Sequence, residues 1–151
     1  MPVSWNRLEV DAIEIAAFGK ARIDGKVAYL ATVNDGWPRV HPVTPIIGNG
    51  RCFIFAEPDS SKVRDLRGNG RFALHCGMSD SSGISGEFKI VGEAVEIEDP
   101  AVRAEAEAVC SFRPSVRSRL FELLISDAIS TSWRSGRADR RRWNSARLES
   151  A

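Results

Sequence analysis

The chain has 151 residues, of which 43% are hydrophobic, and its 21 Lys and Arg against 20 Asp and Glu give a net charge of +1. A chain this close to neutrality has no overall attraction for nucleic acid or for a membrane surface. No apolar run approaches the length of a membrane span. We therefore expect a single domain over residues 1–151, large enough for one hydrophobic core and too small for two.

The three cysteines, Cys52, Cys76 and Cys110, are odd in number, and none has another cysteine close by in the sequence. Zinc sites and disulfide frameworks usually need closely spaced pairs, so neither is expected here. Unpaired thiols are typical of a reducing compartment. The sequence therefore favours the cytoplasm.

The first third of the chain predicts one helix followed by three strands. Apolar residues at helical spacing between Leu8 and Ala17 predict an amphipathic helix that Gly19 ends. Two clusters of Asn, Asp and Gly then mark tight turns, because these residues adopt the positive φ angles that hairpins need. The strands around these turns are expected at residues 27–33, 37–47 and 51–56.

The middle of the chain combines a helix, two strands and a loop. Residues 62–67 predict a short helix, and residues 71–76 predict a fourth strand. Residues 78–86 are rich in Ser, Gly and Asp, which is typical of a surface loop. Residues 87–98 form the clearest long strand, and Gly92 in its interior predicts the sharp bend of a barrel corner.

The last third begins with a strong helix start at Asp99-Pro100. Asp can accept hydrogen bonds from the free amides of the first turn, and Pro has its φ angle preset for the first helical position. The helix is expected over residues 101–110, with another short helical turn at residues 115–119. A strand within residues 120–133 and a turn at residues 135–136 then lead into a terminal hairpin.

These elements predict a mainly β, α+β fold of six or seven antiparallel strands with short flanking helices. Strands joined by tight hairpins are antiparallel, and six such strands usually close into a small barrel. A doubly wound parallel sheet is disfavoured, because the first three strands lack the crossover helices that parallel pairing requires.

The strongest candidate for ligand binding is the start of the helix at residues 62–67. Ser60, Ser61 and Lys62 stand there, shortly after a strand that ends in Phe55-Ala56. Free amides, two hydroxyls and an ammonium group are suited to holding a phosphate, so this interpretation predicts a phosphorylated cofactor. The alternative is that Ser60 only caps the helix and that Lys62 is a solvated surface charge.

Arg39 and His41 alternate along the strand expected at residues 37–47, so their side chains share one face. An imidazole beside a guanidinium could bind a phosphate or the polar edge of a ring. The same pair is also typical of an ordinary polar outer face. Pro42 and Pro45 remove backbone donors, which predicts an irregular strand or an edge strand.

Trp133 and Trp143 flank the terminal hairpin, which is rich in arginine. Aromatic rings beside arginines can stack on a cofactor ring, on a nucleic-acid base or across a subunit contact. A charge run of this kind is also typical of a solvated strand face, and nucleic-acid binding fits poorly with a near-neutral chain. The arginines are Arg137, Arg140, Arg141 and Arg142.

The sequence shows no Ser/His/Asp order, no paired catalytic carboxylates and no cluster of metal ligands, so no metal site is expected and no catalytic residue is identified. Besides His41, the only histidine is His75, at the end of a predicted strand. Redox chemistry supplied by a bound cofactor needs few protein side chains, and it is compatible with this composition.

Several motifs together make the chain similar to the pyridoxamine 5′-phosphate oxidase-like proteins, a family of flavin-binding split β-barrels. The resemblance covers nearly the whole chain and depends on the order and spacing of its motifs. They are Leu30-Ala31-Thr32-Val33 with the turn at Asp35-Gly36, Arg39-Val40-His41-Pro42-Val43, Phe53-Ile54-Phe55-Ala56, Ser61-Lys62-Val63-Arg64-Asp65-Leu66 and the hairpin from Trp133 to Trp143. The resemblance implies a split β-barrel and a homodimer with two flavin mononucleotide (FMN) sites at the subunit interface.

The resemblance also assigns residues to the flavin ring and its ribityl chain. Residues 39–42, that is Arg39, Val40, His41 and Pro42, would line the ribityl and ring side. Phe55 and Ala56 would contact the ring through the backbone. Trp133 and Arg142 would approach the flavin from the second subunit.

Ser61 and Lys62 match the phosphate-binding position of the family, where an arginine commonly precedes the lysine. Ser61 in that place leaves the expected phosphate clamp one guanidinium short. Arg39 would then have to compensate for the missing group.

The resemblance implies an FMN-dependent oxidoreductase, in which FMN takes a hydride from a reduced nicotinamide or a substrate and passes electrons to an acceptor. It does not imply vitamin B6 oxidase activity, because the family's substrate clamp contains a histidine that is missing from residues 138–142. The substrate is a small molecule that the sequence does not identify.

Two alternatives remain open at this point. The first is a reductase that uses the deazaflavin F420, whose longer and more acidic tail would need further basic residues such as Arg64 and Arg67. The second is a non-catalytic flavin or haem carrier or sensor, in which His41 or His75 would be the axial haem ligand.

Overall fold

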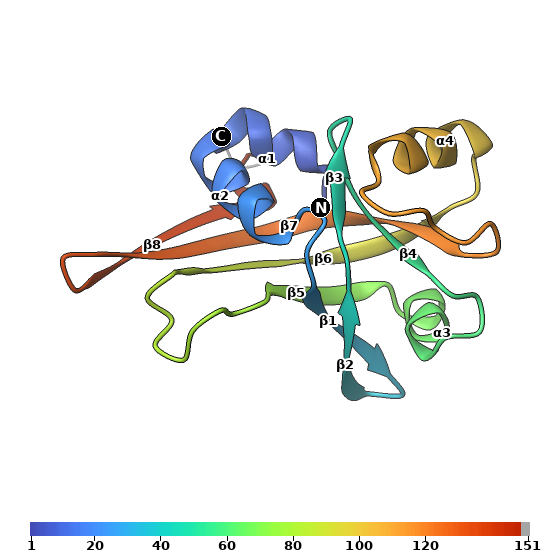
Figure 1. The fold of residues 1–151 in the computed structure, drawn as a ribbon, viewed down its shortest axis with the longest axis horizontal. Helices are drawn as coiled ribbons and strands as arrows, with labels where there is room; N and C mark the ends of the chain where they lie inside the picture. Colours follow the sequence, from blue (N-terminus) through green and yellow to red (C-terminus); the bar gives the residue numbers. More distant parts are fainter. Residues whose placement is uncertain (149–151) are drawn as a thin grey trace.

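The structure, a computed structural model, describes residues 1–148 and contains eight β-strands and four α-helices in that range (Figure 1). The helices are α1 (Trp5–Asp11), α2 (Ile13–Ile23), α3 (Ser61–Gly68) and α4 (Pro100–Val109). The strands are β1 (Ala28–Asn34), β2 (Trp37–Val43), β3 (Ile46–Gly48), β4 (Arg51–Ala56), β5 (Arg71–Cys76), β6 (Glu87–Ile97), β7 (Arg119–Arg134) and β8 (Arg137–Asn144). A 3-10 helix, Ser145–Leu148, ends the described chain.

Three hairpin turns follow from local residue chemistry and confirm the predicted turns. Asp35-Gly36, Asn49-Gly50 and Ser135-Gly136 each place two successive residues at φ angles between 50° and 78°. Two positive φ angles in succession give a turn whose twist matches that of the flanking strands. β4 and β5 also have the bounds expected for strands 51–56 and 71–76.

The expectation of one strand over residues 37–47 is wrong, because the chain forms two strands there. β2 ends at Val43 and β3 begins at Ile46, so the sheet has eight strands rather than six or seven. Pro45 has no N–H for a strand ladder, and its carbonyl instead accepts from the Gly25 amide at 2.8 Å. The Ile47 amide donates to Asp24 at 2.9 Å, so the end of α2 holds this break in place.

The sheet has the strand order β2-β1-β5-β6-β7-β4-β3, with β8 paired to β7, and all its pairings are antiparallel. β2 and β3 lie at opposite ends of this order, yet only Thr44 and Pro45 connect them. The three Cα–Cα steps from Val43 to Ile46 span at most about 11 Å. The sheet must therefore curl until its two edges come close, which gives the expected split barrel and excludes a doubly wound sheet.

The N-terminal region also differs from the expectation, since two helices replace one and Gly19 lies inside α2. A Cβ at Gly19 would lie 2.3 Å from Cζ of Phe88, a fully buried residue of β6. Gly19 therefore allows α2 to approach the sheet closely instead of ending a helix. Trp5 packs edge-on against the same Phe88 ring at 6.2 Å.

β6 and β7 form the long central pair of the sheet, with a register shift between Val91 and Gly92. A Cβ at Gly92 would lie 1.8 Å from the Leu124 carbonyl oxygen, so the predicted bend depends on glycine.

The segment after β6 agrees with the sequence at its first helix but not at the second. Asp99 caps α4 by accepting from the Ala101 amide at 2.9 Å, as expected. No helix forms at residues 115–119, contrary to the prediction: this segment is irregular and β7 begins at Arg119.

The three cysteines are free thiols. Within residues 1–148, no group of three or more His, Cys, Asp and Glu residues is arranged to hold a metal ion. Among the helices of the same range, none has the length and apolar character needed to cross a membrane.

Candidate functional site

A cavity of about 320 Å³ lies between the end of β4, the start of α3 and the segment that precedes β7. It brings together three residues that the sequence assigned to a cofactor: Phe55, Ala56 and Lys62. A volume of this size is at the lower end of the range for small-molecule sites. The full lining consists of Phe55, Ala56, Glu57, Lys62, Phe112, Arg113, Pro114, Ser115 and Ser118.

The start of α3 leaves its first amides without a side-chain cap. Ser60 stands at the capping position, but its hydroxyl donates to the Glu57 carbonyl at 2.8 Å and makes no capping bond. Ser60 therefore stands at the predicted N-cap without a capping bond from its side chain. Uncapped amides carry partial positive charge, and Lys62 adds a full charge at the wall of the cavity.

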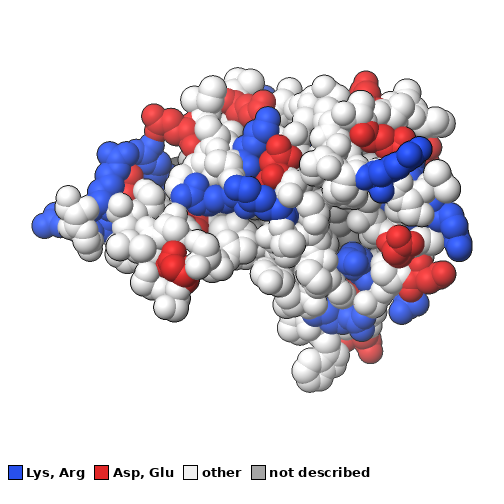
Figure 2. Space-filling model, viewed as in Figure 1, with Lys and Arg blue, Asp and Glu red and all other residues white. Residues whose placement is uncertain are grey.

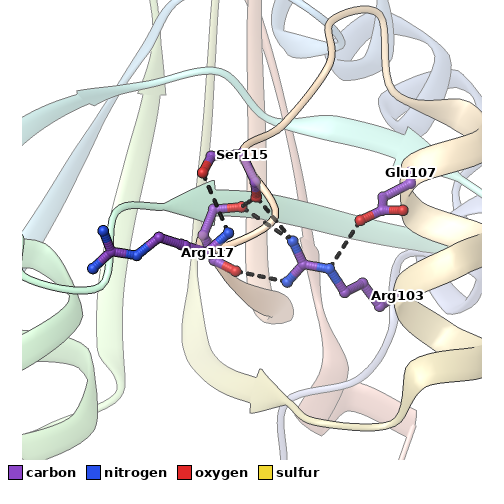
Figure 3. A network of polar contacts seen from close by, with 5 residues as sticks. Arg103, Glu107, Ser115 and Arg117 are labelled. Carbon is purple, nitrogen blue, oxygen red and sulfur yellow. Dashed lines mark hydrogen bonds and ion pairs between the residues drawn. The ribbon is translucent and has the colours of Figure 1, made fainter.

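The segment before β7 is held in place by one arginine of α4, Arg103 (Figure 3). Its guanidinium donates to the Ser118 carbonyl at 2.6 Å and to the Ser115 carbonyl at 3.1 Å, while its Nε donates to Glu107 at 2.9 Å. It also lies 5.5 Å above the Phe55 ring. Arg103 therefore fixes one wall of the cavity relative to another.

Two aromatic rings form the apolar part of this cavity. Phe55 of β4 and Phe112 meet edge to face, with ring centroids 6.3 Å apart and an interplanar angle of 81°. Phe112 is 41% exposed, so much of its ring remains open to a ligand. The cavity thus offers aromatic surface together with two cationic side chains, Lys62 and Arg113.

Beside the cavity, the buried carboxylate of Asp65 connects α3 to β1 and β2. Its Oδ2 accepts from the Thr32 hydroxyl at 2.7 Å, and its Oδ1 accepts from the Asn34 amide at 2.8 Å. Arg39 Nε lies 3.1 Å from the carboxylate and His41 Nε2 lies 3.5 Å from it. We call these five residues the Asp65 cluster; the Asp65 side chain in its centre is fully buried.

The charges of the Asp65 cluster follow from its contacts. Burial opposes ionisation of Asp65, but the hydrogen bonds from Thr32 and Asn34 and the charge of Arg39 outweigh it and hold the pKa of Asp65 below its usual value. Burial lowers the pKa of His41, the charges of Lys62 and Arg39 act in the same direction, and Asp65 opposes them. At neutral pH the cluster therefore contains an anionic Asp65 and a neutral His41.

The other predicted residues of β2 lie on the opposite face of that strand. Val40 is 67% exposed and Pro42 is also exposed, whereas Arg39 and His41 turn toward Asp65. This alternation is the ordinary consequence of strand geometry. Ser61 is the first residue of α3 and is half-buried.

Trp133 of β7 and Arg142 of β8 belong to the terminal hairpin, and neither lines this cavity. The β7–β8 hairpin extends toward the left of Figure 1, while α3 lies at the right. Trp133 is 44% exposed, and Arg142 pairs with Asp127 at 3.1 Å. Lys and Arg side chains gather on the hairpin, at the left of Figure 2.

Asp65, Thr32, Arg103, Arg113 and Phe112 belong to this region, but the sequence analysis did not select them. Thr32 carried a usable signal, because it continues the inward-facing series of Ala28 and Leu30 on β1 and a buried hydroxyl needs a partner. For Arg103 there was no local signal, since its carbonyl partners are 12 and 15 residues away.

His75, the second predicted histidine, stands apart from the Asp65 cluster. Its Nδ1 lies 2.7 Å from the Cys76 carbonyl, which can only accept, so Nδ1 carries the proton. Its Nε2 lies 3.7 Å from Glu87, and the side chain is 38% exposed. His75 is thus a partly exposed imidazole whose Nδ1–H is held by a backbone carbonyl.

Comparison with known proteins gives a family and a fold. The family model of pyridoxamine 5′-phosphate oxidase matches residues 15–125, more than half of the chain. No match was found among curated proteins.

Solved structures with the same fold include binding proteins for two kinds of cofactor. A haem-binding protein from Mycobacterium smegmatis superposes with a TM-score of 0.63 at 19% identity, over 83% of this chain and 57% of that protein. An FAD-binding protein from the same organism gives 0.61 at 15% identity, over 89% and 98%. An FAD-binding protein from Mesorhizobium loti gives 0.61 at 22% identity, over 80% and 92%. At these identities the similarity establishes the split-barrel fold.

Proposed function

This chain belongs to the pyridoxamine 5′-phosphate oxidase family, and we propose that it binds FMN and acts as a flavin-dependent oxidoreductase on a small molecule. The observation that carries the proposal is the cavity at the start of α3, which unites Phe55, Ala56 and Lys62. These residues come from two separate sequence motifs. Their meeting in one cavity is what a site for a phosphorylated aromatic cofactor requires.

The residues of the cavity fit the two ends of such a cofactor. Lys62 and the uncapped amides of α3 would hold the phosphate, and the rings of Phe55 and Phe112 would pack against the apolar part of the flavin. Arg113 lines the same cavity from the segment before β7, and it would offer the guanidinium that Ser61 lacks. Bound FMN would supply hydride and electron transfer, so the protein would chiefly bind, orient and shield the ring.

Arg39 has a more restricted part in this proposal than the sequence suggested. Its Nε faces the Asp65 carboxylate at 3.1 Å, while its side chain remains 39% exposed. The ion pair fixes the direction of the guanidinium. Arg39 would therefore contribute the remaining edge of its guanidinium to the ligand, with Asp65 as its support.

We further propose that the active form is a homodimer. Val40, Ala31, Ala73 and Val91 are neighbours across β2, β1, β5 and β6 on one face of the sheet. Val40 is 67% exposed and Val91 is 36% exposed, and a row of apolar side chains on a sheet face suits burial against a second copy. A monomer in sedimentation equilibrium at micromolar concentration would contradict this part of the proposal.

In such a dimer the β7–β8 hairpin would reach the partner's cavity. The hairpin extends away from its own α3, and Trp133 near its end is 44% exposed (Figure 1). An exposed indole beside exposed arginines is suited to stacking on a ring. Trp133 and Arg142 would then complete the flavin site from the second subunit.

The test is the absorbance spectrum of the purified protein followed by titration with FMN. We expect a flavin spectrum and FMN binding that Lys62→Ala weakens by about 1.5–3 kcal/mol, the value of a hydrogen bond to a charged group, or roughly tenfold to a hundredfold in Kd. Lys20→Ala, an exposed lysine of α2, is the matched control. Unchanged FMN affinity in Lys62→Ala would contradict the phosphate assignment, and binding of F420 in place of FMN would favour the deazaflavin alternative.

Haem binding is a second candidate, and His75 is the observation that favours it. Its Nδ1 donates to a backbone carbonyl and its Nε2 is directed away from that bond, an arrangement common in histidines that bind metals. The Nε2 of His41, by contrast, is engaged with Thr32 at 2.9 Å. A Soret band that His75→Gln abolishes would support haem, and a flavin spectrum without such a band would reject it.

A further inference from the structure

A separate cavity of about 320 Å³ lies between the C-terminal end of α2 and the loop that connects β5 to β6 (Figure 1). Arg22 and Lys26 line it from the side of α2, and Ser79 and Ser85 line it from the loop. The cavity shares no lining residue with the one at Lys62. Among the described residues, its wall contains two cations and two hydroxyl groups but no carboxylate.

The guanidinium of Arg22 is held in one orientation by uncharged groups. Its Cζ lies 3.4 Å from the centre of the Phe18 ring, and it donates to the Phe18 carbonyl at 3.2 Å and to the Ser85 carbonyl at 2.8 Å. An arginine has five N–H donors, so three remain for a ligand. Because these contacts already restrict the side chain, a ligand would lose little entropy in ordering it.

Lys26 has a comparable arrangement on the other cationic part of the wall. Its ammonium donates to the Ala21 carbonyl at 2.7 Å, which stabilises the C-terminal end of α2. Capping the helix uses one of the three N–H donors of the ammonium, and two remain. Helix capping therefore explains the position of Lys26 and leaves most of its hydrogen-bonding capacity unused.

The two cations also lack a counter-ion, which distinguishes them from most basic residues of the chain. Within residues 1–148, neither Arg22 nor Lys26 forms an ion pair with a carboxylate, since the partners of both are backbone carbonyls and an aromatic ring. Seven other arginines do have a carboxylate partner: Arg7, Arg39, Arg51, Arg67, Arg103, Arg141 and Arg142. The positive charge of this cavity is thus left without compensation from the protein.

The carboxylates that are nearest in the sequence are engaged elsewhere. Asp24 accepts from the Ile47 amide at 2.9 Å. Asp80 accepts from the Ser82 hydroxyl at 2.9 Å and from two backbone amides of its own loop. Neither carboxylate lines the cavity. An anion that enters it would therefore meet the two cations without an acidic neighbour on the wall.

The loop adds hydroxyl donors and depends on a glycine to reach Arg22. The hydroxyl oxygens of Ser79 and Ser85 lie 3.4 Å apart, and each hydroxyl can donate to an anion. Gly86 has a φ of +89°, and a Cβ there would lie 2.8 Å from the Thr131 carbonyl oxygen and 3.2 Å from Nη2 of Arg22. Glycine at this position therefore lets the loop approach both groups closely.

We propose that this cavity is a binding site for a phosphate group, carried by a small phosphate ester or present as inorganic phosphate. A guanidinium fork, an ammonium and hydroxyls are the groups that bind phosphate oxygens, and a dianion balances two uncompensated cations. The volume is at the lower end of the range for small-molecule sites, so an ester fits as well as the free ion. The site is independent of the proposed flavin function.

The test is a titration with inorganic phosphate at constant ionic strength, in the Lys62→Ala background so that phosphate binding in the flavin cavity is weakened. We expect saturable binding by calorimetry and shifts of the amide NMR signals of Ser79 and Ser85. Lys26→Gln, at an exposed side chain, should raise the Kd about tenfold to a hundredfold. Lys20→Gln, an exposed lysine of α2 outside this cavity, should leave it unchanged. No saturable binding, or equal affinity in Lys26→Gln, would overturn the inference.

Two further measurements sharpen the assignment. Arg22→Lys keeps the charge but loses the planar fork, and it should raise the Kd about three- to tenfold; an unchanged Kd would overturn the role of Arg22. Tighter binding of glycerol 3-phosphate than of inorganic phosphate would assign the site to a phosphate ester, and equal binding would assign it to the ion. Failure of the wild type to bind FMN would count against the proposed function alone, because this titration uses no flavin.

Discussion

Two arginine–carboxylate pairs in this chain have the same length and opposite surroundings. Arg39 lies 3.1 Å from Asp65, and Arg142 lies 3.1 Å from Asp127. The Asp65 side chain is fully buried, whereas Asp127 is 21% exposed and Arg142 is 59% exposed. Exposed pairs contribute little because water and salt screen them, whereas breaking a buried pair leaves an uncompensated charge or dipole.

The number of partners separates the two regions further. Asp65 connects three elements, because its partners lie on β1 and β2 and it belongs to α3. Among residues 1–148, the partners of the Asp127 side chain are Arg142 and Asn144, both on the neighbouring strand β8. The first carboxylate therefore holds α3 against β1 and β2, whereas the second connects only the two strands of one hairpin. Burial and connectivity, more than distance, decide what an ion pair does.

The largest expected effect comes from removing the centre of the buried cluster. Asp65→Ala would leave the Thr32 hydroxyl, the Asn34 amide and the Arg39 guanidinium without their acceptor. We expect a loss of about 3–5 kcal/mol in the free energy of unfolding, measured by urea denaturation. A loss below about 1 kcal/mol would mean that the cluster behaves like a surface pair, and the contrast between the two regions would fail.

Arg103 is a second arginine that holds part of the structure in place. Its removal should lower the free energy of unfolding less than the removal of Asp65. Arg103→Ala removes the donors that hold the Ser115 and Ser118 carbonyls. We expect a loss of about 1.5–3 kcal/mol, seen as faster amide hydrogen exchange in residues 110–118 and weaker FMN binding. Arg103→Lys is the informative control, because a lysine keeps the charge but lacks the planar fork that bridges both carbonyls. Wild-type exchange in Arg103→Lys would show that charge alone suffices.

The hairpin should matter for the ligand more than for stability. Trp133→Ala is expected to weaken FMN binding by about 1–3 kcal/mol, the range for an aromatic ring stacked on a base, with little change in melting temperature, since Trp133 is 44% exposed in one subunit. Calorimetric titration with FMN measures the first quantity. Trp37→Ala, at an indole that is 74% exposed at the start of β2, is the control. Lost stability with unchanged affinity would assign Trp133 to packing alone.

Acid should lower the free energy of unfolding through the Asp65 cluster in two separate pH ranges. The pKa of His41 is lowered from 6.5 in the folded state, so the unfolded chain takes up this proton first and stability falls as the pH drops below 6.5. The pKa of Asp65 is lowered from 3.8, so its contribution is present above pH 3.8 and is lost below it. Urea denaturation across pH should show the upper decline disappear in His41→Asn. An unchanged decline there would assign it to other groups.

The smallest effect is expected at the exposed pair. Asp127→Ala should cost about 0.2–1 kcal/mol in urea denaturation, because the charges that it separates remain hydrated. A cost comparable to that of Asp65→Ala would show that the hairpin is buried in the protein as it exists in solution. That result would itself favour the homodimer.

Much of the fold was predictable because its signals are local. Asp35-Gly36, Asn49-Gly50 and Ser135-Gly136 form turns through their own backbone preferences, and Asp99 caps α4 through an amide two residues away. The alternation of buried and exposed residues along β6 is likewise visible in the sequence. Physical effects that act over a few residues leave a readable pattern.

The candidate site could be described only by combining the sequence motifs with the tertiary structure. Phe55, Ala56 and Lys62 were selected from their motifs, and the structure places them in one cavity. Val40 and Pro42 were selected with Arg39 and His41, but strand alternation puts them on the other face. A motif thus identified the segment, and the geometry of β2 decided which of its side chains meet Asp65.

The sequence by itself determined the antiparallel class of the sheet and its hairpins, and it indicated the segments that line the candidate site. Only the tertiary structure decided that residues 37–47 divide between two sheet edges, that Gly19 accommodates Phe88, and that Asp65 and Arg103 organise the cavity. The reason is the separation of the partners: Thr32 stands 33 residues before Asp65, and Pro45 meets Gly25 across the end of α2. Contacts between segments that are distant in the sequence form only when the chain has folded, so no local sequence pattern predicts them.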